Sequence, residues 1–146
     1  IFEIAEGIRP GNREAAIAAF EELGEMAGDA LASAITLIDG LIVIGGGLSG
    51  ASKYILPVLL KEMNAQTGMM DGARFGRLQK EVYDLDDEKS FAGFARGEAV
   101  EVLVPGTNRK LGYDPCKRIG VTFSKQGANR SIAMGAYVFA LNHLSK

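Results

Sequence analysis

The chain has 146 residues, of which 47% are hydrophobic and 23% are charged. These fractions are close to those of soluble globular proteins, and the length fits one domain with its own core. The formal net charge of −2 offers no basic surface for nucleic acid or for an anionic membrane. No apolar run approaches the ~20 residues of a membrane-spanning helix. We therefore expect a cytoplasmic protein without a signal peptide.

Cysteine and histidine are too scarce for several common kinds of site. The sequence has one cysteine, Cys116, and one histidine, His143. An intrachain disulfide is therefore excluded, and so is a zinc site built only from these residue types within one chain. His143 falls near the end of a predicted helix, where a surface role is more common than catalysis. We predict no catalytic residue and no metal ligand in this chain.

The first third of the chain predicts helices. A short helix at 1–7 is followed by a long one from Asn12, a good N-cap, to about residue 38. Apolar residues recur along the long helix at three- or four-residue steps, from Ile17 through Phe20 and Leu23 to Ile38. Gly24 and Gly28 lie one turn apart, and we interpret them as a place where another backbone packs closely.

The remaining elements alternate between strands and helices. Residues 41–44 predict a strand buried on both faces, as in a parallel sheet, and a glycine turn at 45–50 leads into a helix at 51–64. Beyond them the patterns predict, in order, one or two helical turns within 75–83, a solvated acidic loop at 84–88, a short helix near 91–95, a strand at 99–104, a turn region at 108–115, a strand at 118–123 and a helix at 128–144. This order indicates an α/β fold.

The glycine turn is the motif with the clearest chemistry. A turn without side chains lets a ligand approach the backbone, and the following helix presents free N–H groups and a positive dipole end. Together they predict a site for a phosphorylated or ribosylated ligand. Gly45, Gly47 and Gly50 also satisfy the G-x-G-x-x-G pattern of dinucleotide-binding folds. That fold needs a strand ending in an acid soon after the helix, and 64–76 has no β-branched apolar run. A flavin- or nicotinamide-dependent oxidoreductase remains a less favoured alternative.

Two longer patterns resemble a known family. They are Phe20-x-x-Leu23-Gly24-x-x-x-Gly28-x-Ala30-Leu31-Ala32 and Ile35-x-x-Ile38-Asp39-Gly40-Leu41-Ile42-Val43-Ile44-Gly45-Gly46-Gly47-Leu48-Ser49. Both resemble the C-terminal half of ROK-family sugar kinases, and Ser131-Ile132-Ala133-Met134-Gly135-Ala136 agrees with the last helix of that family. The resemblance covers 12–64 and 118–144, and we expect 65–117 to be an insertion that is atypical of the family.

The resemblance implies a fold and a site. The fold would be the C-terminal subdomain of an actin-like (ribonuclease H-like) ATPase, with a short sheet flanked by long helices. The chain would then be a single nucleotide-binding subdomain, 1–146, of a longer protein. The site would bind ATP, with Mg²⁺, through five successive residues of the glycine turn: Gly45, Gly46, Gly47, Leu48 and Ser49.

The resemblance also implies a reaction. An ATP-dependent kinase would transfer the γ-phosphoryl group to a hydroxyl of a glucose-like hexose. The catalytic aspartate and most of the sugar contacts belong to the N-terminal half of such kinases, to which nothing here corresponds. We expect a homodimer without a membrane partner. A sugar-responsive transcriptional repressor of the same family, which would bind nucleic acid, is the alternative that this half of the chain leaves open.

Overall fold

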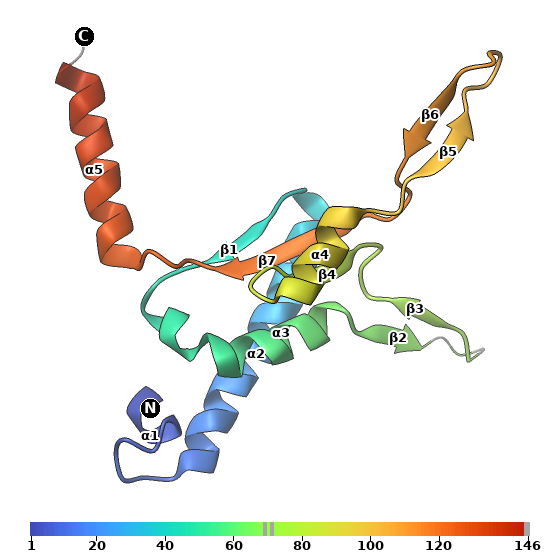
Figure 1. The fold of residues 1–146 in the computed structure, drawn as a ribbon. Coiled ribbons are helices and arrows are strands. Elements are labelled where there is room, and N and C mark those ends of the chain that lie inside the picture. The colour runs from blue at the N-terminus through green and yellow to red at the C-terminus, as the bar shows by residue number, and fades with distance from the viewer. Residues whose placement is uncertain (69, 71, 145–146) are drawn as a thin grey trace.

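The computed structural model describes residues 1–68, 70 and 72–144, in which helices alternate with short strands (Figure 1). In chain order the elements are α1 (Phe2–Ala5), α2 (Arg13–Leu37), β1 (Ile42–Ile44), the 3₁₀ helix η1 (Gly47–Ala51), α3 (Ser52–Met63), β2 (Gln66–Gly68), β3 (Arg74–Gly76), β4 (Glu81–Asp84), α4 (Glu88–Arg96), β5 (Val100–Leu103), β6 (Lys110–Tyr113), β7 (Arg118–Phe123) and α5 (Ala128–Leu144). The predicted α/β class is confirmed.

A parallel sheet with the strand order β1-β7-β4 forms the centre of the fold. β7 has the bounds that the sequence predicts, and its residues Ile119 and Val121 are almost completely buried. One face of the sheet packs on α2 and α3. The other face is covered over β4 and β7 by α4, where the rings of Tyr83 and Phe94 lie 6.0 Å apart. Within the described residues, the sheet is thus covered on both faces over β4 and β7.

The predicted burial of the first strand on both faces is wrong. Ile42 faces the core and is buried, whereas Val43 is 63% exposed. The physical reason is position: β1 lies at the edge of the sheet, beyond the part that α4 covers (Figure 1). An apolar run alone does not distinguish an edge strand from a central one.

The long helix α2 packs against α3 through its two glycines. A Cβ added to Gly24 would lie 2.6 Å from the carbonyl oxygen of Ile55, and one added to Gly28 would lie 2.9 Å from that of Leu59. The predicted close approach of another backbone is therefore confirmed. The predicted apolar stripe is partly wrong, since Leu23 is 37% exposed. The face of α2 that contacts α3 is instead the one with Gly24 and Gly28, because glycines allow the two helix axes to come closest.

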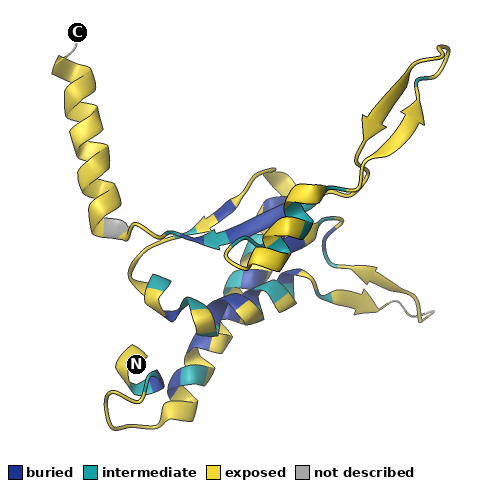
Figure 2. Ribbon diagram, viewed as in Figure 1, coloured by how far each residue is buried: buried dark blue, intermediate teal, exposed yellow. Residues whose placement is uncertain are grey.

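Helix α5 and the β5–β6 hairpin project away from the sheet (Figure 1), and both are largely exposed (Figure 2). The predicted bounds of α5 are confirmed, and apolar residues such as Ile132 and Phe139 lie open on it. Across the described part of the chain, none of the helices has the length and apolar character needed to cross a membrane.

The sequence prediction is wrong in two stretches between α3 and β7. The predicted helical turns within 75–83 are instead the end of β3 and most of β4, and the predicted turn region at 108–115 contains β6. β4 is stabilised by parallel pairing with β7, far along the chain, and β6 by antiparallel pairing with β5. Pairing with another strand overrides the weak secondary-structure propensity of a short segment.

Candidate functional site

The carboxyl ends of the three parallel strands meet at one edge of the sheet. β1 ends at Ile44 and β7 at Phe123, and these two residues are paired in register. β4 ends at Asp84, one strand further along. The glycine turn, the loop after β7 and the loop before α4 all leave the sheet here. Because open parallel sheets bind ligands outside this edge, we take it as the candidate site.

The glycine turn presents bare backbone at this edge. Gly46 has φ 104° and ψ −169°, a conformation that residues with a side chain rarely adopt. A Cβ added to Gly46 or Gly47 would have no atom of the described chain within 4 Å. The amide of Ser124 donates a 2.8 Å hydrogen bond to the carbonyl of Ile44, so the loop after β7 lies directly beside the turn. A ligand can therefore approach the backbone of the turn without displacing a packed neighbour.

The other predicted binding residues lie in the same turn. Leu48 is half exposed. The hydroxyl of Ser49 donates a 2.8 Å hydrogen bond to the carbonyl of Gly46, and the Ser49 amide donates to the same oxygen at 3.2 Å. Ser49 therefore stabilises the turn from within. The structure brings the five predicted residues together, and their contact with a nucleotide stays a prediction.

Asp86, in the loop after β4, connects two of the strand ends, and sequence reasoning missed it. Its carboxylate accepts hydrogen bonds from the Phe123 amide and the Thr122 hydroxyl, both at 3.0 Å, and lies 3.3 Å from the Lys125 amine. The Phe123 amide is the main reason that the pKa of Asp86 is lowered, with smaller contributions from Thr122 and Lys125. Asp86 is exposed in a loop, as predicted, but its hydrogen bonds to the end of β7 were not predicted from the sequence.

The same loop begins helix α4. Asp87 is the N-cap of that helix and accepts a 2.8 Å hydrogen bond from the Ser90 amide. An aspartate directly before a helical pattern is a capping signal that the sequence contains. No such local signal marks Asp86, because its partners lie on a distant strand.

A cavity of about 480 Å³ lies between α3 and the end of β4. It is lined by residues along one side of α3 and by two carboxylates: Ser52, Lys53, Leu56, Pro57, Leu60, Asp84 and Asp86. The Lys53 amine is paired with Glu6 at 2.8 Å and lies 5.0 Å from the centre of the Tyr54 ring. Lys53 is therefore already engaged, although it borders the cavity.

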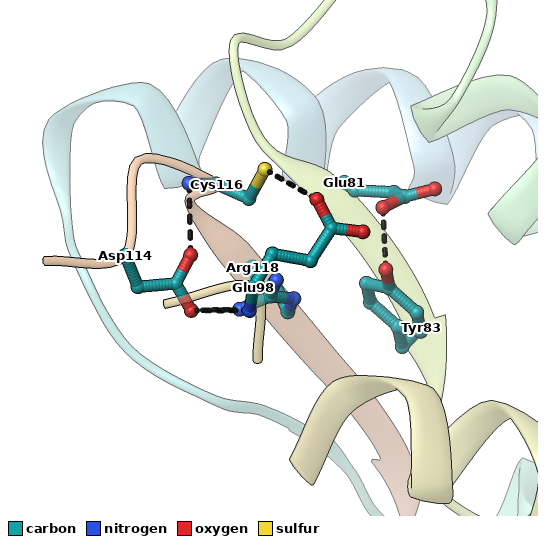
Figure 3. Close-up of polar contacts among 6 residues, drawn as sticks. All are labelled: Glu81, Tyr83, Glu98, Asp114, Cys116 and Arg118. Atoms are coloured by element: carbon teal, nitrogen blue, oxygen red, sulfur yellow. Dashed lines mark hydrogen bonds and ion pairs between the residues drawn. The ribbon is translucent and has the colours of Figure 1, made fainter. Parts of the chain in front are cut away.

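A second polar cluster lies at the foot of the β5–β6 hairpin (Figure 3). The Asp114 carboxylate accepts hydrogen bonds from the amides of Glu98 and Cys116, at 3.1 and 3.0 Å, and from the Arg118 guanidinium. These bonds tie both feet of the hairpin to the start of β7. The Cys116 thiol donates to a Glu98 carboxylate oxygen at 3.4 Å, which raises the pKa of that thiol. A thiol kept protonated is a poor nucleophile, so this cluster is structural.

A larger cavity, of about 680 Å³, lies at the amino ends of β4 and β7, where Glu81 and Lys117 are among its lining residues. It is remote from the glycine turn, and the edge at which parallel sheets bind ligands is the opposite one. Among the residues that the structure describes, no three or more His, Cys, Asp or Glu side chains are grouped to hold a metal ion.

The strand order argues against a dinucleotide-binding fold. In that fold the strand that follows the first helix lies next to the first strand, and its terminal acid holds the ribose. Here β4 does end in an acid, Asp84, but β7 lies between β4 and β1. The G-x-G-x-x-G pattern therefore occurs here in a strand order that differs from that of dinucleotide-binding folds.

Comparison with known proteins gives one informative match. No family model matches the sequence, and no curated protein matches it. A solved structure that it does match is that of a glucokinase from Parabacteroides distasonis ATCC 8503, with 93% sequence identity and a TM-score of 0.79 over 97% of this chain. The chain matches a segment of a glucokinase. It spans 38% of the length of that glucokinase chain.

The glucokinase match confirms the predicted resemblance and is consistent with the expected C-terminal half. It places the glycine turn, Asp86 and the cavity beside α3 in a segment that resembles part of a sugar kinase. Of these, the glycine turn at 45–50 is the element to which the family resemblance assigned the nucleotide.

Proposed function

We propose that this chain forms the ATP-binding side of an ATP-dependent kinase that acts on a glucose-like hexose. One observation carries the proposal: an open glycine turn lies at the carboxyl edge of a parallel sheet, in a chain 93% identical to a glucokinase segment. The kinase class comes from the match, and the location of the nucleotide comes from the geometry of the turn.

The chain's own contribution would be binding and orientation. The backbone of Gly45, Gly46 and Gly47 would contact the adenosine and the α-phosphate, and Leu48 would line the same pocket. The amino end of α3 follows the turn through η1, and its dipole favours negative charge. Since Ser49 already donates to Gly46, its role would be to keep the turn in shape.

The reaction would be completed by groups outside this chain. In the whole enzyme an oxygen of the sugar forms a bond to the γ-phosphorus while the bond to the β-phosphate oxygen breaks, and a carboxylate takes the hydroxyl proton. Mg²⁺ supplied with ATP offsets the phosphate charge. The actin-like fold, the homodimer and the cytoplasmic location stay predictions.

Gly47→Val in the full-length protein tests the proposal. Gly47 has no neighbour within 4 Å, and its φ lies outside the left-handed region, so valine fills the open space without straining the backbone. We expect the KM for ATP to rise by about tenfold or more, equivalent to roughly 1.4 kcal/mol of lost binding, while the KM for the sugar changes little.

Gly40→Val is the matched control. Gly40 lies just before β1, at the other end of the same strand, and it also has open space and no left-handed φ. We expect this variant to behave as the wild type. A folded Gly47→Val enzyme with an unchanged KM for ATP would refute the proposed location of the nucleotide.

The two alternatives from the sequence are not favoured. The match is to a glucokinase, which gives no support to a repressor, and the strand order differs from that of a dinucleotide-binding fold. Neither is proposed.

A further inference from the structure

We propose that Lys125 binds the phosphate groups of the nucleotide and that Asp86 positions it for this role. The inference rests on the proposed function, since it assumes that the adenosine lies at the glycine turn. Lys125 is the second residue after β7, and the preceding residue, Ser124, touches the turn: a Cβ on Gly45 would lie 3.6 Å from that of Ser124. The lysine therefore leaves the sheet beside the bare backbone.

Among the described residues at this edge, Lys125 carries a charged amine that can exchange its partner at low cost. Its side chain is 82% exposed, and its amine pairs with Asp86 at 3.3 Å. Exposed ion pairs of this length contribute little, so exchanging the carboxylate for a phosphate costs little. Lys53, the other lysine near the turn, is held more closely by Glu6, at 2.8 Å, with its amine over the Tyr54 ring.

Asp86 does not depend on the lysine. Its two oxygens also accept from the Phe123 amide and the Thr122 hydroxyl, and these bonds persist when Lys125 turns to a ligand. Asp86 thereby fixes the end of β7, which sets the point from which the lysine reaches outward. It is a positioning residue, and its carboxylate would remain satisfied with a nucleotide bound.

The two carboxylates of the cavity favour a further cation beside Lys53, which lines the cavity but is already paired with Glu6. Asp84 and Asp86 both line the space next to α3, and two carboxylates would repel a polyphosphate that approaches the turn. The exposed amine of Lys125, which already lies beside Asp86, can offset this repulsion. Lysine suits the task because its ammonium is a point charge on a flexible stem, without the fixed geometry of arginine.

The test is a series of ligands measured by calorimetry on the full-length protein, with adenosine, AMP, ADP and ATP, the last two with Mg²⁺. We expect Lys125→Ala to weaken ATP binding by about tenfold, as a lost hydrogen bond between charged groups does. The loss should decrease for ADP and AMP and vanish for adenosine. Lys125→Arg, which keeps the positive charge but not the geometry of the ammonium, should recover part of the ATP affinity.

Lys89→Ala is the control, because it removes the same charge from an exposed position on α4 and should leave all four affinities unchanged. Three outcomes would overturn the inference. Equal ATP affinity in Lys125→Ala and the wild type refutes the proposed role of Lys125 and leaves the proposed function intact. An equal loss for all four ligands assigns it a structural role. A wild-type protein that binds none of the four ligands refutes the proposed function itself.

Discussion

Replacing Gly24 by alanine adds one methyl group at the tightest contact between α2 and α3. That methyl carbon would lie 2.6 Å from the carbonyl oxygen of Ile55, whereas ordinary contacts begin at 3.4 Å. The helices would have to separate by about 0.8 Å, because a carbonyl within a helix cannot rotate away. Buried residues of the core, including Leu59, would lose contact as the helices separate.

Two effects of opposite sign decide how far Gly24→Ala changes the free energy of unfolding. Overpacking of this kind costs roughly 1–3 kcal/mol, and the rigid carbonyl puts Gly24→Ala near the upper end. Alanine improves helix propensity by up to about 1 kcal/mol relative to glycine. We therefore expect a net loss of about 1–2 kcal/mol in the free energy of unfolding, so the steric term wins.

Urea-induced unfolding followed by circular dichroism measures this change, and Ala30→Gly provides the reference. Ala30 is exposed on the same helix, so its replacement reports the helix-propensity term alone, a loss of up to about 1 kcal/mol. Both variants should be less stable than the wild type, although the exchanges run in opposite directions. If Gly24→Ala instead raised stability by as much as Ala30→Gly lowers it, the close contact would play no part.

Two further predictions follow from the pKa shifts. Because the Phe123 amide lowers the pKa of Asp86 in the folded state, Asp86 stabilises the fold above its unfolded pKa of about 4, and this contribution is lost as the pH falls through the lower folded value. Asp86→Asn should therefore be less stable than the wild type at pH 7, by a margin that shrinks below about pH 4 in unfolding curves, and a margin independent of pH would contradict the assignment. Glu98 raises the pKa of the Cys116 thiol, so iodoacetamide should alkylate Cys116 slowly at pH 7, and Glu98→Gln should speed the reaction. Equal rates in the two proteins would show that the contact between Cys116 and Glu98 does not control the thiol.

Local signals in the sequence determined the individual elements. The Asn12 cap and the apolar period located the long helix, and β7 and α5 have the bounds that their patterns predict. The glycine turn and the close approach at Gly24 and Gly28 were also predictable. Each of these features depends on residues within a few positions of one another, where capping, periodicity and the lack of a side chain act directly.

The tertiary structure alone decided which segments meet. β4 exists because β7 pairs with it, and Val43 is exposed because β1 lies at the sheet edge. Asp86 connects the ends of β4 and β7 only because the end of β7 lies within hydrogen-bonding distance of it. These contacts join residues far apart in the chain, and their energies depend on distances that no short stretch of sequence specifies.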